Sequence, residues 1–190
     1  MKREKLFVVF VLMMCGLMSV NSVKADGSPT DNVTVNLKFR PVQSITVAAS
    51  QETVDLIYAT EANYQNGVSA TLADHLTVFS TGGVAVSVKA DTENFTSTST
   101  GAVGIPVGDV VISAANGTGN SVSATLTDVP LATTNDTLIA SEDGGRDLKF
   151  NVTYDNTVAG SSDSYINKYI HPDNPETVYT TTVTYTIVTK

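Results

Sequence analysis

The sequence predicts an all-β protein with an immunoglobulin-like antiparallel β-sandwich. Two observations carry this prediction. Valine and threonine, which favour strands, recur in short runs, and asparagine, glycine, aspartate and serine, which favour turns, separate those runs. Amphipathic runs with the period of a helix are hard to find. Many short strands at this spacing, with turn residues between them, are typical of a sandwich or a barrel.

The first 25 residues are expected to be a secretory signal peptide and to lie outside the fold. A basic start precedes an apolar stretch that is short for a bilayer span. Val23 and Ala25 then stand at the positions that a signal peptidase prefers. A retained membrane anchor is the weaker interpretation, because a polar run follows at once. Export of a chain that begins at Asp26 is therefore expected.

Charge and cysteine content restrict the partners and the chemistry. The whole chain has a formal net charge of -8, and removing the basic leader makes it more acidic. Nucleic acid is a poor partner for such a surface, because phosphate binding needs a basic footprint. Cys15 is the sole cysteine and lies in the expected leader. The exported chain would then fold without disulfides and would have neither a thiol nucleophile nor a cysteine–zinc site.

A short N-terminal extension, residues 26–41, is expected to precede a sandwich domain over residues 42–190. The predicted strands are 31–40, 42–49, 53–59, 75–80, 84–90, 106–113, 121–127, 136–141, 146–154 and 177–189. The stretch 61–76 is expected to hold a helical turn or a crossing loop, and 157–176 a long connection across one end of the sandwich. Gly144 and Gly145 predict the turn of a plain hairpin.

The most regular predicted strand is DNVTVNLKFRPV, residues 31–42. Its apolar side chains share one parity: Val33, Val35, Leu37 and Phe39. The other parity is polar, so a strand here has one apolar face. Pro41 sets the strand apart, because a proline cannot donate to a central ladder. The apolar face fills either the core of its own sandwich or the core of a neighbouring copy.

The last predicted strand, 177–189, is amphipathic in the same way. Its apolar parity holds Tyr179, Val183, Tyr185 and Ile187, and threonines occupy the other parity. Both ends of the expected mature chain therefore carry strongly amphipathic strands, which are prone to pair with another edge.

No constellation of residues indicates an enzyme, a cofactor or a metal site. His75 and His171 are the two histidines, and neither has carboxylates at a metal-binding spacing. Asp74 and His75 are neighbours on a predicted strand and are expected to be a surface pair that faces opposite sides. Nucleophile elbows and S-x-x-K motifs are missing from the sequence. The acidic cluster at 142–147 lacks the alternating spacing of a calcium loop. We predict a non-catalytic protein without a cofactor.

The order of these elements resembles the structural subunits of chaperone–usher pili, especially the alternative (alpha, class 5) fimbrial group. The stretches that carry the resemblance are NVTVNLKFRPVQSITV, VDLIY, LATTNDTLIAS and YTTTVTYTIVTK. Subunits of this family have a signal peptide, an alternating N-terminal donor strand and an incomplete immunoglobulin-like sandwich. Tyr179 departs from the pattern of the family's last strand, because no glycine follows at the expected place.

The resemblance implies a bacterial fimbrial subunit that supports cell adhesion at the surface. A periplasmic chaperone would hold it, an outer-membrane usher would export it, and like subunits would polymerise by donor-strand exchange. The implied donor residues are Val33, Val35, Leu37 and Phe39. The implied acceptor-groove residues are Val183, Tyr185 and Ile187.

An exported binding module for surface polysaccharide or peptidoglycan is the alternative hypothesis. Tyr165, Tyr169 and Tyr179 lie in or next to the long connection and could form a small aromatic platform for such a ligand. Tyrosines at the end of a sandwich more often pack against it with their hydroxyls in water, which weighs against this alternative.

Overall fold

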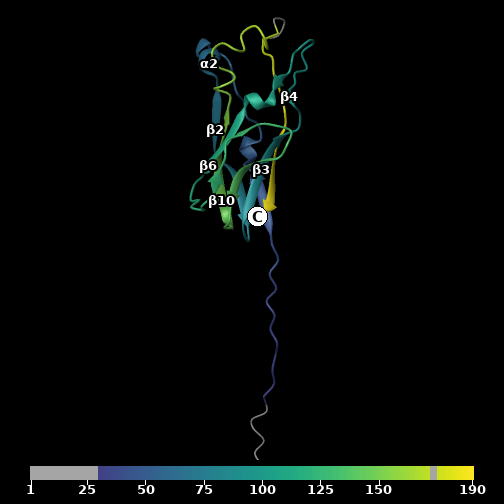
Figure 1. Ribbon diagram of the computed structural model, residues 1–190, viewed down its shortest axis with the longest axis vertical. Coiled ribbons are helices and arrows are strands. Elements are labelled where there is room, and N and C mark those ends of the chain that lie inside the picture. Colours follow the sequence, from purple (N-terminus) through teal and green to yellow (C-terminus); the bar gives the residue numbers. More distant parts are fainter. Residues whose placement is uncertain (1–29, 172–174) are drawn as a thin grey trace, which may run out of the picture. The chain divides into compact units, whose positions relative to one another are not determined.

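The computed structural model describes residues 30–171 and 175–190, so the expected signal peptide lies outside the described residues. The chain divides into two compact units, one that ends at Phe39 and one from Arg40 to Lys190. Residues 30–39 of the first unit have no regular secondary structure. The second unit is built from antiparallel sheets packed on each other (Figure 1), which confirms the predicted all-β sandwich.

The larger sheet has the strand order β1-β2-β10-β6-β8, and all its pairs are antiparallel. Its strands are β1 (Gln43–Val47), β2 (Ser69–Ser80), β6 (Val111–Asn116), β8 (Val129–Pro130) and β10 (Gly145–Asp155). The two edges of this sheet are therefore β1 and β8.

The second sheet has the order β11-β3-β9-β7 and is also antiparallel. Its strands are β3 (Val84–Ala90), β7 (Thr125–Leu126), β9 (Asp136–Ser141) and β11 (Val183–Thr189). A separate pair consists of β4 (Asn94–Phe95) and β5 (Ile105–Pro106). The helical elements are η1 (Ala49–Gln51), α2 (Glu61–Asn66) and η2 (Val107–Asp109).

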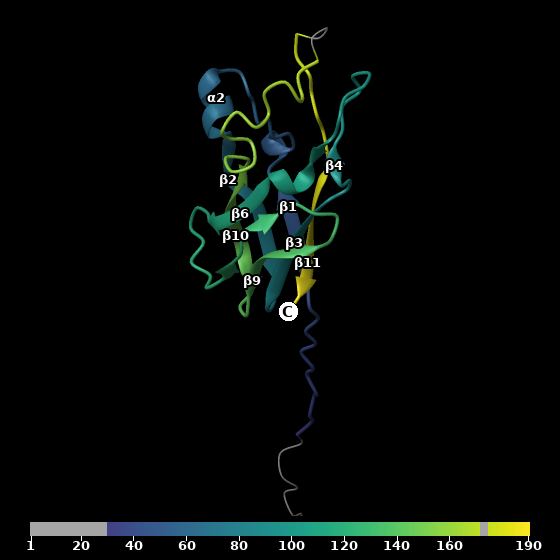
Figure 2. The ribbon, with the colours of Figure 1, turned by 45° about the horizontal axis from the view of Figure 1, so that its top comes forward.

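The core lies between the two sheets and is filled mainly by their central strands. In Figure 2, β2, β10 and β6 lie on one side of the unit and β3 and β11 on the other. Val86 and Val88 of β3, Ile139 of β9 and Val152 of β10 are fully buried. Burial of one such side chain stabilises a fold by about 1.5–3 kcal/mol. The side chains that both sheets direct into the centre of the sandwich are therefore fully shielded from water.

Agreement between the predicted and observed strands is best where a strand is central. The bounds of β3 and β9 match the predictions for 84–90 and 136–141. The prediction for 75–80 covers only the second half of β2. The stretch 61–76, which was predicted to hold a helical turn or a loop, contains the short helix α2 and also the first part of β2. The predicted strand 53–59 is wrong: it is extended but belongs to no ladder. Hydrophobic alternation reports a face, and it does not require a hydrogen-bonded neighbour.

The turn after β9 is not the plain hairpin that the glycines predicted. β9 and β10 belong to different sheets, so this turn carries the chain across the sandwich. Gly144 lies against the backbone of β2, where a Cβ would meet the carbonyl oxygen of Ser80 at 2.3 Å. A glycine is thus required here for close approach of two backbones. The same turn residues serve a hairpin and a crossing between sheets, and this is why the sequence misled.

Candidate functional site

The edge at which β1 and β11 come together is incompletely closed. These two strands are edges of different sheets and lie next to each other. Within the described residues no ladder joins them. We call this edge, formed by β1 and β11, the open seam.

The inner side of β11 is only partly covered. Val183, Tyr185 and Ile187 lie opposite Ala90, Val88 and Val86 of β3 and share their core-facing side. Those three partners are 0–1% exposed, whereas Val183, Tyr185 and Ile187 are only partly buried. The three predicted groove residues thus line the border of the core, at an edge strand where their side chains are not fully covered.

The β1 side of the seam shows the same incomplete burial. Ile45 and Val47 lie opposite Val78 and Leu76, which are fully buried, yet both are only partly buried themselves. After η1, the extended segment 53–58 continues the pattern with inward side chains that pack on the core, among them Val54 and Leu56. A strand that entered this seam, with β1 displaced from β11, would gain both ladder hydrogen bonds and apolar burial.

A buried chain of hydrogen bonds stands behind the seam. The hydroxyl of Tyr185 lies 2.8 Å from the hydroxyl of Tyr154, which lies 3.2 Å from Nε2 of His75. Nδ1 of His75 lies 3.0 Å from Oε1 of Gln51. Burial lowers the pKa of His75 and raises the pKa values of both tyrosines. These four hydrogen-bonded side chains are therefore uncharged at neutral pH, and they connect Tyr185 to the opposite sheet.

A bulge in β2 turns His75 into this position. The register between β2 and β10 shifts between the pairs Phe150–Leu76 and Val152–Leu72, and Asp74 within the shift has φ 52°. Because alternation is interrupted there, the successive residues His75 and Leu76 are both buried. The expectation of a surface pair at Asp74 and His75 is therefore wrong for His75.

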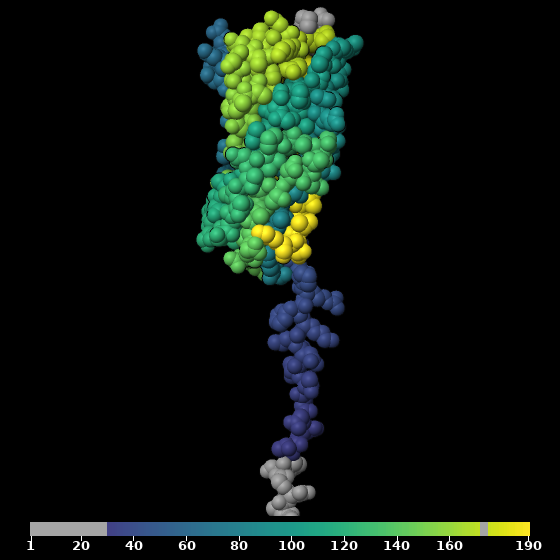
Figure 3. Space-filling model, viewed as in Figure 1, coloured from purple at the N-terminus to yellow at the C-terminus, as the bar shows by residue number. Residues whose placement is uncertain are grey.

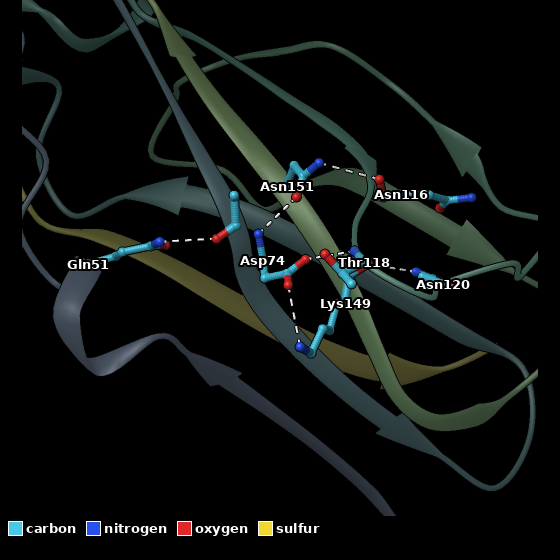
Figure 4. Close-up of polar contacts among 8 residues, drawn as sticks. Gln51, Asp74, Asn116, Thr118, Asn120, Lys149 and Asn151 are labelled. Atoms are coloured by element: carbon cyan, nitrogen blue, oxygen red, sulfur yellow. Dashed lines mark hydrogen bonds and ion pairs between the residues drawn. The ribbon is translucent and has the colours of Figure 1, made fainter.

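Polar contacts around Asp74 fix the bulge (Figure 4). Its carboxylate accepts a hydrogen bond from the backbone N–H of Thr118 at 2.7 Å and pairs with Nζ of Lys149 at 3.3 Å. Its own N–H donates to Oδ1 of Asn151 at 2.8 Å. The Thr118 hydrogen bond is the main reason why the pKa of Asp74 is lowered. The break in alternation at LADHL is the one sequence signal that could have revealed this arrangement.

The predicted donor residues lie in the first unit and are exposed. Val33, Val35, Leu37 and Phe39 are 87%, 79%, 79% and 90% exposed. All sheet strands of the described chain lie between Gln43 and Thr189, so the strand predicted over 31–40 is not formed in a single copy of the chain. An apolar face of this kind in water marks a surface that is covered by something else.

The three tyrosines of the alternative hypothesis lie together, but edge to face. Tyr165 is buried; its hydroxyl donates to Oδ2 of Asp109 at 2.8 Å and accepts from Nδ2 of Asn156 at 3.0 Å. The ring centroids of Tyr165 and Tyr169 are 4.9 Å apart, and those of Tyr169 and Tyr179 are 5.7 Å apart. Tyr165 is thus a packing residue, and only Tyr169 and Tyr179 retain exposed surface.

Residues 30–171 and 175–190 contain no group of three or more histidine, cysteine, aspartate or glutamate side chains placed to hold a metal ion. Of the helices in this range, none is long and apolar enough to cross a bilayer.

No protein-family model matches this chain, and no curated protein shows significant sequence similarity to it.

Proposed function

We propose that this protein is a structural subunit of a bacterial fimbria and polymerises by donor-strand exchange. The observation that carries the proposal is the presence, in one chain, of an exposed alternating segment and an open seam with a partly buried inner side. The segment offers an apolar face, and the seam has apolar side chains that are only partly covered. Each copy would supply the strand that another copy needs.

The two parts match in length and in pattern. The donor residues Val33 to Phe39 span the same number of residues as β11, which runs from Val183 to Thr189. Directly opposite residues of an antiparallel pair share one face of the sheet. Antiparallel insertion would place Phe39 opposite Val183, with the next apolar pairs at Leu37–Tyr185 and Val35–Ile187.

Insertion would be strongly favourable. Complete burial of an exposed aliphatic or aromatic side chain contributes about 1.5–3 kcal/mol, and the donor has four of them. Main-chain hydrogen bonds along the free side of β11 would add affinity and fix the register. Because the donor and the seam are different surfaces, the contact is head to tail and grows into a filament. Before assembly, a periplasmic chaperone would cover the seam, and an outer-membrane usher would receive the subunit.

One pair of neighbouring substitutions tests the donor. In the exported full chain, Leu37→Asp places a charge on the apolar parity, and Asn36→Asp places the same charge on the polar parity. Both residues are exposed in the subunit, so neither change should disturb its own fold. We expect size-exclusion chromatography to show multimers for the unchanged chain and for Asn36→Asp, and monomers for Leu37→Asp.

Disulfide trapping then tests the acceptor. A copy with Val35→Cys mixed with a copy carrying Ile187→Cys should give a cross-linked dimer, and Asn36→Cys should not replace Val35→Cys. The natural Cys15 lies in the expected leader and does not interfere after its removal. If the unchanged chain stays monomeric at every concentration and Leu37→Asp has no effect, donor-strand exchange is refuted, and the binding-module hypothesis becomes the stronger one.

A further inference from the structure

The two ends of the sandwich unit differ in chemistry. At one end, Val42 pairs with Thr81, and the N–H of Lys190 donates to the carbonyl oxygen of Gly83 at 3.1 Å. We call this end, formed by Val42, Thr81–Gly83 and Lys190, the turn end. The other end is reached by the opposite termini of β2 and β10, where Ser69 lies opposite Asp155. This second end carries α2 and the connection that follows β10.

Apolar side chains gather at that second end. Val178, Ile170 and Ile166 are 60%, 62% and 46% exposed, and Tyr64, Ile166, Asn167 and Ile170 line a shallow depression. In Figure 3 the segment 157–171 covers this end of the unit. We call the surface formed by Tyr64, Ile166, Tyr169, Ile170, Val178 and Tyr179 the tyrosine surface.

The tyrosine surface is rigidly built. A row of rings runs from α2 to the chain that enters β11, with centroid separations of 5.3 Å for Tyr64–Tyr58, 5.5 Å for Tyr58–Tyr165, 4.9 Å for Tyr165–Tyr169 and 5.7 Å for Tyr169–Tyr179. The N–H groups of Ser162 and Asp163 donate to carbonyl oxygens of α2 at 2.8 and 2.9 Å. A surface that is fixed before binding loses little entropy when a partner covers it.

The chain between the donor segment and the sandwich is very short. Val42 is held at the turn end, since its N–H donates to Oγ1 of Thr81 at 3.0 Å. Only Arg40 and Pro41 separate it from Phe39, and a chain extends by at most about 3.3–3.6 Å per residue. Once Phe39 is inserted into an acceptor, the turn end of the donor copy must lie within about 10 Å of the end of that seam.

The direction of insertion decides which end of the acceptor the donor copy meets. β11 runs toward the turn end, because Lys190 follows it there. An antiparallel donor places Phe39 at the Val183 end, from which the acceptor chain leads back through Thr180 to Tyr179 and Val178. A parallel donor would instead bring two turn ends together, where the acceptor's own Val42 and Lys190 already occupy the space. β1 and β11 run in opposite directions, so a donor can be antiparallel to only one of them. For a donor that pairs with β11, the first arrangement matches the antiparallel ladders of the described sheets.

We infer that the tyrosine surface of an acceptor copy binds the turn end of the copy that donates its strand to it, an inference that rests on the proposed function. The donor strand would supply most of the affinity, and the tyrosine surface would make the joint between successive subunits stiff. The surface therefore contributes to association of whole subunits and not to binding of an isolated donor strand.

The test separates these two contributions. Val178→Asp and Ile170→Asp place a charge in the tyrosine surface, and Leu126→Asp places the same charge on β7, at the far edge of the sheet that contains β11. Each variant is made in the full chain, and assembly is followed by analytical ultracentrifugation. A synthetic peptide with the sequence of residues 30–41 is titrated into the same variants combined with Leu37→Asp, which supplies free seams.

We expect Val178→Asp and Ile170→Asp to weaken subunit association by about tenfold or more, as for loss of an apolar contact at an interface. Peptide affinity should stay unchanged, and Leu126→Asp should change neither. If the peptide binds but all three variants assemble like the unchanged chain, the inference is wrong while donor-strand exchange stands. If the peptide does not bind at all, the proposed function and this inference fail together.

Discussion

Two stretches of this protein have nearly the same pattern and opposite surroundings. Residues 33–39 read VTVNLKF, and β3, residues 84–90, reads VAVSVKA. In β3 the inward side chains of Val84, Val86, Val88 and Ala90 are 0–1% exposed, whereas the apolar side chains of residues 33–39 are 79–90% exposed. β3 has a strand on each side and a sheet in front of it. Alternation therefore defines an apolar face, and neighbours elsewhere in the chain, or in another chain, decide whether this face is buried.

The largest expected effect comes from the same charge placed in the two stretches. Val86→Asp puts a carboxylate without a partner into the closed core, and we expect it to lower the free energy of unfolding by about 4 kcal/mol or more. Val35→Asp should change the stability of a free subunit by less than about 0.5 kcal/mol. Urea unfolding of dilute monomers measures both. Equal destabilisation by the two variants would show that residues 33–39 are buried in their own subunit.

An intermediate effect is expected across one ladder, where Ile187 of the open seam lies opposite Val86. A fully buried isoleucine loses about 2–5 kcal/mol on substitution by alanine. Ile187→Ala should cost less than that in a free subunit, because the side chain is only partly buried. When a donor strand covers the seam, the missing contacts should appear as weaker binding, by about tenfold for each 1.4 kcal/mol.

Titration of the peptide of residues 30–41 into the Leu37→Asp background measures this difference. Val86→Ala is the matched control, since it also shortens a side chain on this ladder but faces the closed core. The control should leave peptide affinity unchanged. Equal loss of peptide affinity in both variants would mean that general destabilisation, and not the seam, is responsible.

The smallest effect should be a pH dependence that begins behind the seam. Burial lowers the pKa of His75 below its usual 6.5, so the folded state binds its proton less readily than the unfolded state. Its contribution is complete above pH 6.5 and is lost as the pH falls from there toward the lowered value. The slope should not exceed about 1.4 kcal/mol per pH unit, as for one proton.

Urea unfolding at several pH values from about 7.5 to about 4.5 would measure this slope in the unchanged chain and in His75→Gln. The variant should show a flatter dependence, because glutamine at position 75 does not bind a proton. Asp74 does not confuse the result, since its pKa is lowered from 3.8 and its contribution is lost only at lower pH. An unchanged slope in His75→Gln would exclude His75 as its source.

The fold class was predictable from the sequence, but several local arrangements were not. Composition was sufficient to locate β3 and β9, which are both central strands; burial in β3 follows a strict period of two, whereas in β9 the successive residues Leu138 and Ile139 are both buried. The bulge at Asp74 was missed, since it depends on hydrogen bonds to Thr118 and Asn151 from distant parts of the chain. Segment 53–58 was predicted as a strand because its side chains alternate, although no other backbone lies beside it in a ladder.

The open seam was predictable only in part. The inner residues Val183, Tyr185 and Ile187 follow from parity, but parity says nothing about how fully they are covered. The hydrogen-bonded chain from Tyr185 to His75 was invisible, because it joins three strands that are far apart in sequence. The row of tyrosines was noticed as a cluster, yet its edge-to-face packing and the burial of Tyr165 depend on Asp109 and on α2.

By itself the sequence determined that the protein is all-β, which side chains share a face, and that two stretches near its ends are strongly amphipathic. These are properties of neighbouring residues, whose side chains alternate because the backbone of a strand is pleated. The tertiary structure alone decided which strands pair, which edge stays open and which way His75 points. Burial and hydrogen bonding need a second surface, and a local pattern contains no information about where in space that surface lies.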